Sequence, residues 1–168
     1  MTIATRRLLL IPYNESLQSD FLMLHCCAKN RAEMNGPHTV ASAKQLFHQV
    51  MHDPTLYALA VLDQTSREYI GHVFVCHLDK KPELGFIFDK YYWNKGIGSE
   101  ALKAFFPKAL YECQLETITA TVNTQHIASI KILQKLGFQL SGERSDGYGP
   151  FYEYVFTADV LADQNLRA

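Results

Sequence analysis

The sequence lacks an excess of either charge. Lys and Arg number 16 against 17 Asp and Glu, and the densest basic clusters, Arg6-Arg7 and Lys80-Lys81, are only pairs. Nucleic-acid binding depends on clustered basic side chains that release counterions from phosphates. We therefore expect no nucleic-acid partner.

Long apolar runs are also missing. The longest run near the first residues, Leu8 to Ile11, is far too short to cross a bilayer, and the opening residues lack the apolar stretch of a secretory signal. These absences predict a cytoplasmic protein with no membrane partner.

Cysteines are few and carry no metal-site spacing. Cys26, Cys27, Cys76 and Cys113 form no C-x-x-C pair, the spacing from which zinc sites commonly draw their ligands. We expect free thiols in a reducing compartment and no metal.

What is present is the composition of one globular domain. The chain has 168 residues, of which 48% are hydrophobic and 20% charged, enough to bury a real core in a single domain over residues 1–168. Hydrophobic periodicity predicts strands at 8–11, 56–62, 69–78, 83–88, 115–122, 138–140 and 151–156, and helices at 15–30, 42–52, from 99 onward, and 128–136. Short turn-rich separators favour antiparallel hairpins. This order predicts a mixed α/β (α+β) sheet.

Two helix boundaries follow from single residues. Ser42 is a suitable N-cap for the second helix. Pro107 removes a backbone hydrogen bond from the third helix, so we expect a kink or an early stop there.

Gly96-Ile97-Gly98 stands directly before the third helix. Glycine allows the backbone to approach an anion closely, and the free N–H groups at a helix start attract negative charge. A diphosphate suits such a turn, although a purely structural turn has the same pattern.

Two other phosphate motifs fit less well. A Walker A loop needs Gly-Lys-Ser/Thr, which is absent from the sequence. Gly96 to Ala101 reads G-x-G-x-x-A, but residues 89–95 separate it from its strand, and Glu116 opens the next strand instead of ending it. We therefore reject a dinucleotide-binding fold.

Three blocks in sequence order resemble the GNAT superfamily of N-acetyltransferases, most closely its RimJ/RimL-type enzymes, which acetylate protein N-terminal amines. The blocks are Thr5–Pro12, then Glu83–Phe86 with Tyr92–Leu102, and finally Ala128–Phe138. The resemblance implies a mostly antiparallel central sheet of about seven strands, flanked by about four helices.

The resemblance also implies an activity. Acetyl-CoA would donate its acetyl group directly to a primary amine, of a protein N-terminus or a small molecule, without a metal. The residues implied in cofactor binding are Phe86, Ile87, Phe88, Trp93, Asn94, Lys95, Gly96, Ile97, Gly98, Ser99, His126 and Ser129.

Catalytic residues are harder to assign. We favour Glu83 as the base that deprotonates the amine through water, with Asp146 and Glu153 as rivals, and an exposed strand-end carboxylate as the plain alternative. Many superfamily members carry a tyrosine acid where this chain has Leu133. We therefore assign the acid to Ser129, which could equally be a helix-start hydroxyl bonding to backbone.

Three questions stay open at this level. A non-catalytic acyl-CoA sensor, or an acetyltransferase of a small amine or antibiotic, fits the same motifs. The oligomeric state, monomer or homodimer, cannot be read from the sequence.

Overall fold

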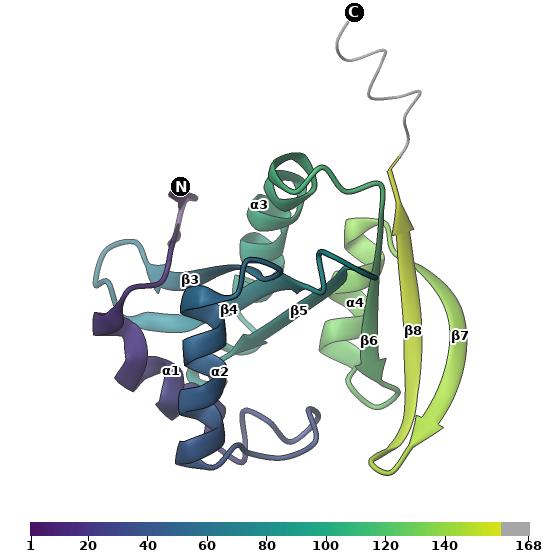
Figure 1. Ribbon diagram of the computed structural model, residues 1–168, viewed down its shortest axis with the longest axis horizontal. Helices are drawn as coiled ribbons and strands as arrows, with labels where there is room; N and C mark the ends of the chain where they lie inside the picture. The colour runs from purple at the N-terminus through teal and green to yellow at the C-terminus, as the bar shows by residue number, and fades with distance from the viewer. Residues whose placement is uncertain (159–168) are drawn as a thin grey trace, which may run out of the picture.

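The computed structural model describes residues 1–158, whose eight strands form one sheet in the order β1-β2-β3-β4-β5-β6-β8-β7 (Figure 1). The strands are β1 (Ile3–Ala4), β2 (Leu8–Ile11), β3 (Tyr57–Asp63), β4 (Tyr69–Cys76), β5 (Glu83–Phe88), β6 (Thr117–Asn123), β7 (Gln139–Asp146) and β8 (Gly149–Thr157). The helices are α1 (Gln18–His25), α2 (Val40–His52), α3 (Ile97–Glu112) and α4 (Ile127–Leu136), with short 3-10 turns η1 (Glu15–Leu17) and η2 (Lys90–Tyr92). The expected mixed, mostly antiparallel sheet is confirmed. The additional strand, β1, has only two residues and gives no periodic signal.

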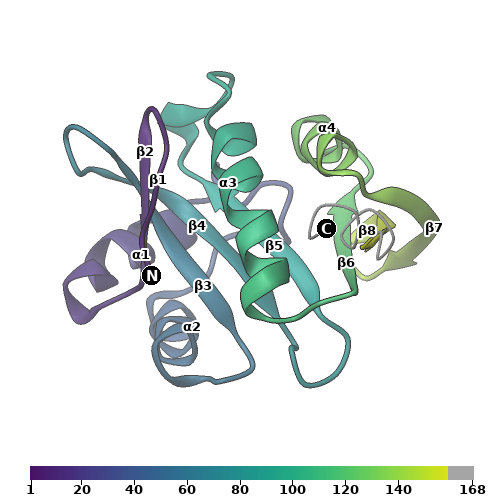
Figure 2. The same cartoon turned by 90° about the horizontal axis from the view of Figure 1, so that it is seen from above.

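Helices cover both faces of the sheet. In Figures 1 and 2, α1 and α2 lie on one face of β3 to β5, and α3 lies on the other. The core between α3 and the sheet contains Leu8, Val73, Leu102 and Phe105, all with no exposed surface. Within these described residues, no helix is both long and apolar enough to span a bilayer.

Two helix expectations need correction. The N-cap of α2 is Thr39, whose hydroxyl accepts the Ser42 N–H at 3.1 Å. Ser42 lies three residues further on, and its Oγ accepts the Thr39 N–H. This reciprocal capping box shifts the start of the helix by two residues. The first helix ends at His25, well before Asn30.

Pro107 does not end α3. The helix continues through it to Glu112. Buried Phe105, Phe106 and Ala109 pack into the core on both sides of the proline. Burial of these side chains outweighs the one backbone hydrogen bond that proline removes.

β5 and β6 are the single parallel pair of the described sheet, and they pair at one position only. Glu83 faces Thr119, and the Thr119 N–H donates to the Pro82 carbonyl at 3.0 Å. Beyond this point the strands diverge, and β6 continues its pairing with β8 from Thr117 to Asn123. Figure 1 shows β6, β8 and β7 turned away from the rest of the sheet. The β6-facing edge of β5 beyond Glu83 is therefore left without a strand partner in the described chain.

Candidate active site

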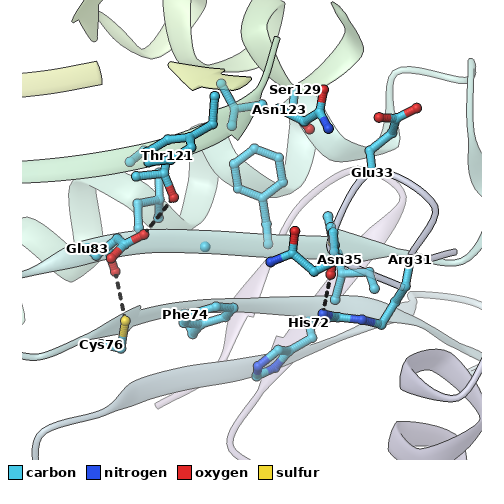
Figure 3. A pocket seen from close by; sticks show the side chains of 18 of the residues that line it. Arg31, Glu33, Asn35, His72, Phe74, Cys76, Glu83, Thr121, Asn123 and Ser129 are labelled. Carbon is cyan, nitrogen blue, oxygen red and sulfur yellow. Dashed lines mark hydrogen bonds between the residues drawn. The ribbon is translucent and has the colours of Figure 1, made fainter. Parts of the chain in front are cut away.

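A cavity of about 680 Å³ occupies the wedge between β5 and β6. It is lined from β4, β5, β6, α2, α4, the 26–38 loop and the β7–β8 turn, and Figure 3 shows many of these side chains. The residues assigned from the sequence to cofactor binding or catalysis that line it are Glu83, Phe86, Ile87, His126 and Ser129, together with the rival base Asp146. The wedge thus brings both predicted catalytic side chains to one cavity.

Alternate residues of β4 form one wall of the cavity. His72, Phe74 and Cys76 share a face, and across the strand pair Phe74 stands opposite Gly85. A Cβ atom added to Gly85 would lie 2.1 Å from the Phe74 ring, so the ring needs glycine beneath it. This wall was not predicted from the sequence, in which alternation indicates only that the three side chains share a face.

Glu83 is held by the neighbouring strand. Thr121 Oγ1 donates to its carboxylate at 3.0 Å, as the dashed line in Figure 3 shows. The Cys76 thiol points to the Glu83 backbone carbonyl, with 3.7 Å between sulfur and oxygen. Burial, together with the Glu83 charge, raises the pKa of Cys76 to about 11, so this thiol stays protonated at neutral pH.

The two rival carboxylates differ in position. Asp146 lines the cavity at the β7–β8 turn and accepts the Tyr148 N–H at 2.9 Å. Glu153 is not among the lining residues, and it pairs with Lys81 at 3.5 Å and with Arg144 at 3.6 Å. The cavity therefore joins Glu83 with Asp146 and leaves Glu153 outside.

Ser129 and His126 form a pair at the start of α4. The Ser129 Oγ lies 3.1 Å from His126 Nε2, and the serine is buried. Burial lowers the pKa of His126, so a neutral imidazole adjoins the hydroxyl at pH 7. One helical turn further, Leu133 lines the same cavity with an apolar side chain.

Two buried histidines lie at the end of the cavity near α1. His72 Nδ1 lies 2.8 Å from the Tyr13 hydroxyl, and that hydroxyl lies 2.6 Å from the Tyr69 hydroxyl. His25 Nδ1 donates to the Phe21 carbonyl at 2.8 Å. Burial lowers the pKa of His25 to about 4, and burial beside His25 holds the pKa of His72 well below its ordinary value. Both rings are therefore neutral at pH 7.

The glycine turn presents free amides at the start of α3. Gly96 is the N-cap, with φ +75°, a conformation that glycine adopts without strain. The Glu100 N–H donates to the Gly96 carbonyl at 3.1 Å, so the N–H groups of Ile97, Gly98 and Ser99 precede the first intrahelical bond. Three such amides can bind an anion.

Side chains around this turn fix it in place. Arg7 Nε donates to Glu100 at 2.8 Å, and Arg7 Nη1 donates to the Lys95 carbonyl at 2.9 Å. Trp93 Nε1 donates to the Phe88 carbonyl at 2.8 Å, which ties the turn to the end of β5.

Gly98 lets α3 approach α4 closely. A Cβ atom there would lie 3.0 Å from Ile132 and 3.2 Å from Phe88. The turn therefore adjoins both β5 and α4, although residues 88 and 93–99 do not line the cavity itself. The predicted cofactor residues thus divide between the cavity (Phe86, Ile87, His126, Ser129) and the turn beside it (Phe88, Trp93, Asn94, Lys95, Gly96, Ile97, Gly98, Ser99).

Known proteins share both sequence and fold with this chain. Over 75 residues it is 35% identical to the uncharacterized N-acetyltransferase YnaD of Bacillus subtilis (strain 168), and the match covers 44% of each chain, less than half of that relative's own length. Spermidine N-acetyltransferase from Vibrio cholerae, solved with CoA and spermine, superposes with a TM-score of 0.80 at 13% identity, covering 91% of this chain and 96% of that one.

A second solved structure shares the fold as well. The Salmonella typhimurium acetyltransferase that modifies the N-terminal serine of ribosomal protein L7/L12 superposes with a TM-score of 0.77 at 16% identity, covering 95% of this chain and all of that one. At these identities the two solved structures show a common fold. Residues 7–139 match the acetyltransferase (GNAT) domain, most of the chain, and this match confirms the family expected from the three sequence blocks. With its split sheet and its glycine turn before α3, the chain belongs to the acetyltransferase (GNAT) family.

Proposed function

We propose that this protein transfers the acetyl group of acetyl-CoA to a primary amine. The observation that carries the proposal is the wedge, whose open β5 edge runs between the free amides of α3 and the cavity that contains Glu83 and Ser129. A linear co-substrate with an anionic end and a reactive thioester end fits such an arrangement.

The residues of the turn and of β5 fit the cofactor chemically. The N–H groups of Ile97, Gly98 and Ser99 would bind the pyrophosphate at the positive end of the helix dipole. The unpaired β5 edge from Leu84 to Phe88 would bind the amides of the pantetheine arm as an added strand would. Bound there, acetyl-CoA supplies a thioester whose carbonyl carbon an amine can attack directly.

The side chains of the cavity would then move two protons. Glu83 would accept the proton of the attacking ammonium, directly or through water, while Thr121 holds its carboxylate in place. Ser129 would give its hydroxyl proton to the departing sulfur. Neutral His126, 3.1 Å away, could donate a hydrogen bond through Nε2 to the Ser129 oxygen and hold it in place. The second proton of the acylated nitrogen would then restore the Ser129 hydroxyl.

The charge of the cavity supports a cationic acceptor. Its lining residues include four carboxylates, from Glu33, Asp53, Glu83 and Asp146, against the single guanidinium of Arg31 in the described chain. Arg31 is itself engaged, since it donates from Nε to the Gly36 carbonyl at 2.7 Å. Because an amine is protonated at neutral pH, this field would concentrate it near Glu83. We propose a protein N-terminal amine as acceptor, with a small amine or an antibiotic as the alternative.

A direct assay tests the proposal. The purified protein is incubated with acetyl-CoA and a panel of amines that includes peptides with free N-termini, the same peptides blocked at the N-terminus, a polyamine and an aminoglycoside. Release of free CoA is followed together with the mass of the product. The proposal predicts acetylation that depends on a free amine, and a rise in melting temperature with CoA. A protein that shows no turnover and no CoA-dependent shift in melting temperature would refute the proposal.

A non-catalytic acyl-CoA sensor is the second candidate, and Leu133 at the usual position of the acid favours it. It predicts the same rise in melting temperature with CoA and no turnover with any amine. The two measurements together therefore separate the two functions.

A further inference from the structure

Three metal-ligating side chains converge at the Glu83 end of the cavity. One ligand atom each from Cys76, His77 and Glu83 lies within 4.8 Å of the other two. All three residues line the cavity. No sequence motif indicates this group, because five residues, 78–82, lie between the Cys76-His77 pair and Glu83.

The β4–β5 hairpin explains how they meet. Cys76 is the register partner of Glu83 across the strand pair. Neighbours in a continuing strand point to opposite faces, but β4 ends at Cys76, and His77 adopts a left-handed conformation with φ +56°. The turn at His77 thus brings an imidazole to the side of the thiol and the carboxylate.

The donor set suits zinc. Thiolate, imidazole and carboxylate are its three protein ligands, and three of them leave a fourth position open. Ligand atoms on one tetrahedral zinc lie about 3.5 Å apart, as bond lengths of ~2.0–2.3 Å require, so shifts of about 1 Å would close the site. Thiolate and carboxylate together would neutralise the doubly charged ion.

A supporting hydrogen bond is already present. Metal-bound carboxylates are commonly oriented by a further hydrogen bond. The Thr121 hydroxyl donates to Glu83 Oε1 at 3.0 Å, which leaves the second carboxylate oxygen available for the ion (Figure 3). His77 is exposed, so an ion can reach the site from solvent.

We propose that Cys76, His77 and Glu83 form a zinc site, and that zinc bound there inhibits the enzyme by withdrawing the Glu83 carboxylate from the acceptor amine. On binding, the Cys76 S–H bond breaks, a sulfur–zinc bond forms and the proton passes to solvent. Zinc binding is independent of the proposed acetyl transfer. Only the inhibition by zinc rests on the proposed acetyl transfer.

Cobalt(II) substitution tests the site without any activity. Co²⁺ is titrated anaerobically into the reduced, metal-free protein, and a thiolate-to-cobalt charge-transfer band that Zn²⁺ abolishes is the expected result. Cys76→Ser should lose the band entirely, and His77→Ala should weaken Co²⁺ binding at least tenfold. Absence of the band, or its persistence in Cys76→Ser, would overturn the proposal. Because His77 is exposed, its variant tests the site even if Cys76→Ser fails to fold.

Matched controls separate this site from other ligands. His48 and His52 stand one turn apart on α2 with ring centroids 4.5 Å apart, so His52→Ala breaks up this imidazole pair and should leave the band unchanged. Cys113→Ser, another free thiol, should do the same. Thr121→Val should lower Co²⁺ affinity about 10-fold or more, because it removes the hydrogen bond that orients the metal-binding carboxylate of Glu83.

The inhibitory step is measured separately by product mass, since free CoA thiol itself binds zinc and would distort a thiol assay. Micromolar Zn²⁺ should abolish most of the turnover of the wild-type protein. In His77→Ala, referenced to its own metal-free rate, at least tenfold more Zn²⁺ should be needed. Equal inhibition of both proteins would refute the inhibitory role. A cobalt band in a protein without turnover would instead contradict the proposed acetyl transfer and leave the metal site standing.

Discussion

The two ends of the wedge are made from different parts of the polypeptide. The cofactor end is a contiguous stretch, residues 88–99, in which the proposed contacts are backbone N–H groups. The acceptor end is made of side chains from the 26–38 loop, from several strands and helices and from the β7–β8 turn. A backbone site depends on conformation, whereas a side-chain site depends on residue identity at many separate positions.

One buried side chain connects the two ends. Asn30, in the loop that lines the acceptor end, donates to Asp89 Oδ2 at 3.1 Å and accepts the Lys90 N–H at 2.8 Å. It therefore fixes the connection between β5 and the glycine turn to the 26–38 loop. The comparison predicts that substitutions at the acceptor end change turnover, and that those at the turn change cofactor affinity.

The largest effect is expected at the acceptor end. Glu83→Gln keeps the shape and the Thr121 hydrogen bond but removes the base. We expect kcat to fall on the order of 10²–10⁴-fold, the usual contribution of general acid–base catalysis. The dissociation constant for CoA, measured by calorimetry, should stay within about twofold.

Glu153→Gln is the matched control for this variant. Its carboxylate is paired with Lys81 and Arg144 and does not line the cavity. It should keep turnover near that of the wild-type protein. If Glu153→Gln lost activity and Glu83→Gln kept it, the base would be Glu153 on β8 and not Glu83.

The next effect is a loss of stability at low pH, which comes from a buried histidine at the acceptor end. The pKa of His25 is lowered to about 4 by burial, from an ordinary 6.5. Its contribution to stability is complete above pH 6.5 and is lost as the pH falls toward 4, because over this range only the unfolded chain takes up the proton. At ~1.4 kcal/mol per pH unit, the loss is about 3 kcal/mol.

Denaturant titrations at pH 7 and pH 4 measure this loss. The side chain of His25→Gln cannot titrate. Between pH 7 and pH 4 the free energy of unfolding of this variant should therefore fall by about 3 kcal/mol less than that of the wild-type protein. His52→Gln, at an exposed position, should behave as the wild-type protein does. Identical losses in the wild type and His25→Gln would show that the buried ring is not responsible.

Most of the fold could be predicted because its elements carry local signals. Alternation identified the strands, and Gly137 marked the end of α4, where its φ is +96°. One error lies where tertiary contacts override local preference, because core packing carries α3 past Pro107. The other is a missed local signal, because the capping box between Thr39 and Ser42 sets the start of α2.

The site divides in the same way. The glycine turn is a local motif, so it was visible in the sequence. His72, Phe74 and Cys76 carry no motif, and only the pairing of β4 with β5 places them beside Glu83. The residues of the 26–38 loop line the cavity because α1 ends early, at His25. Helical periodicity did not indicate this early end. Acceptor identity therefore lies in the part of the site that local patterns describe least.

A smaller effect is expected at the glycine turn. Gly96→Ala places a side chain at φ +75°, which costs ~1–2 kcal/mol for an L-residue. If the turn relaxes to relieve this strain, CoA should bind about tenfold more weakly, since ~1.4 kcal/mol corresponds to a factor of ten.

Gly149→Ala supplies the comparison at the other end. Its φ of +112° imposes a similar strain, and no atom lies within 4 Å of the added Cβ. It should lower the melting temperature comparably, raise the acceptor KM and leave CoA binding unchanged. Equal loss of CoA affinity in both variants would mean that the two ends are not separable.

The smallest effect concerns the support of the turn. Arg7→Ala removes the ion pair with Glu100 and the bond to the Lys95 carbonyl, but Glu100 still accepts from Thr5 Oγ1 at 2.6 Å and from the residue 7 N–H at 3.0 Å. Because the Arg7 side chain is 43% exposed, the ion pair contributes roughly 0.2–1 kcal/mol. We expect a two- to threefold rise in the KM for acetyl-CoA, smaller at high salt because ions screen the pair, and an unchanged kcat. Arg6→Ala, its exposed neighbour, should change neither constant. A fall in kcat for Arg7→Ala without a change in KM would contradict the division of the wedge, because it would tie the support of the cofactor turn to the chemistry at the acceptor end.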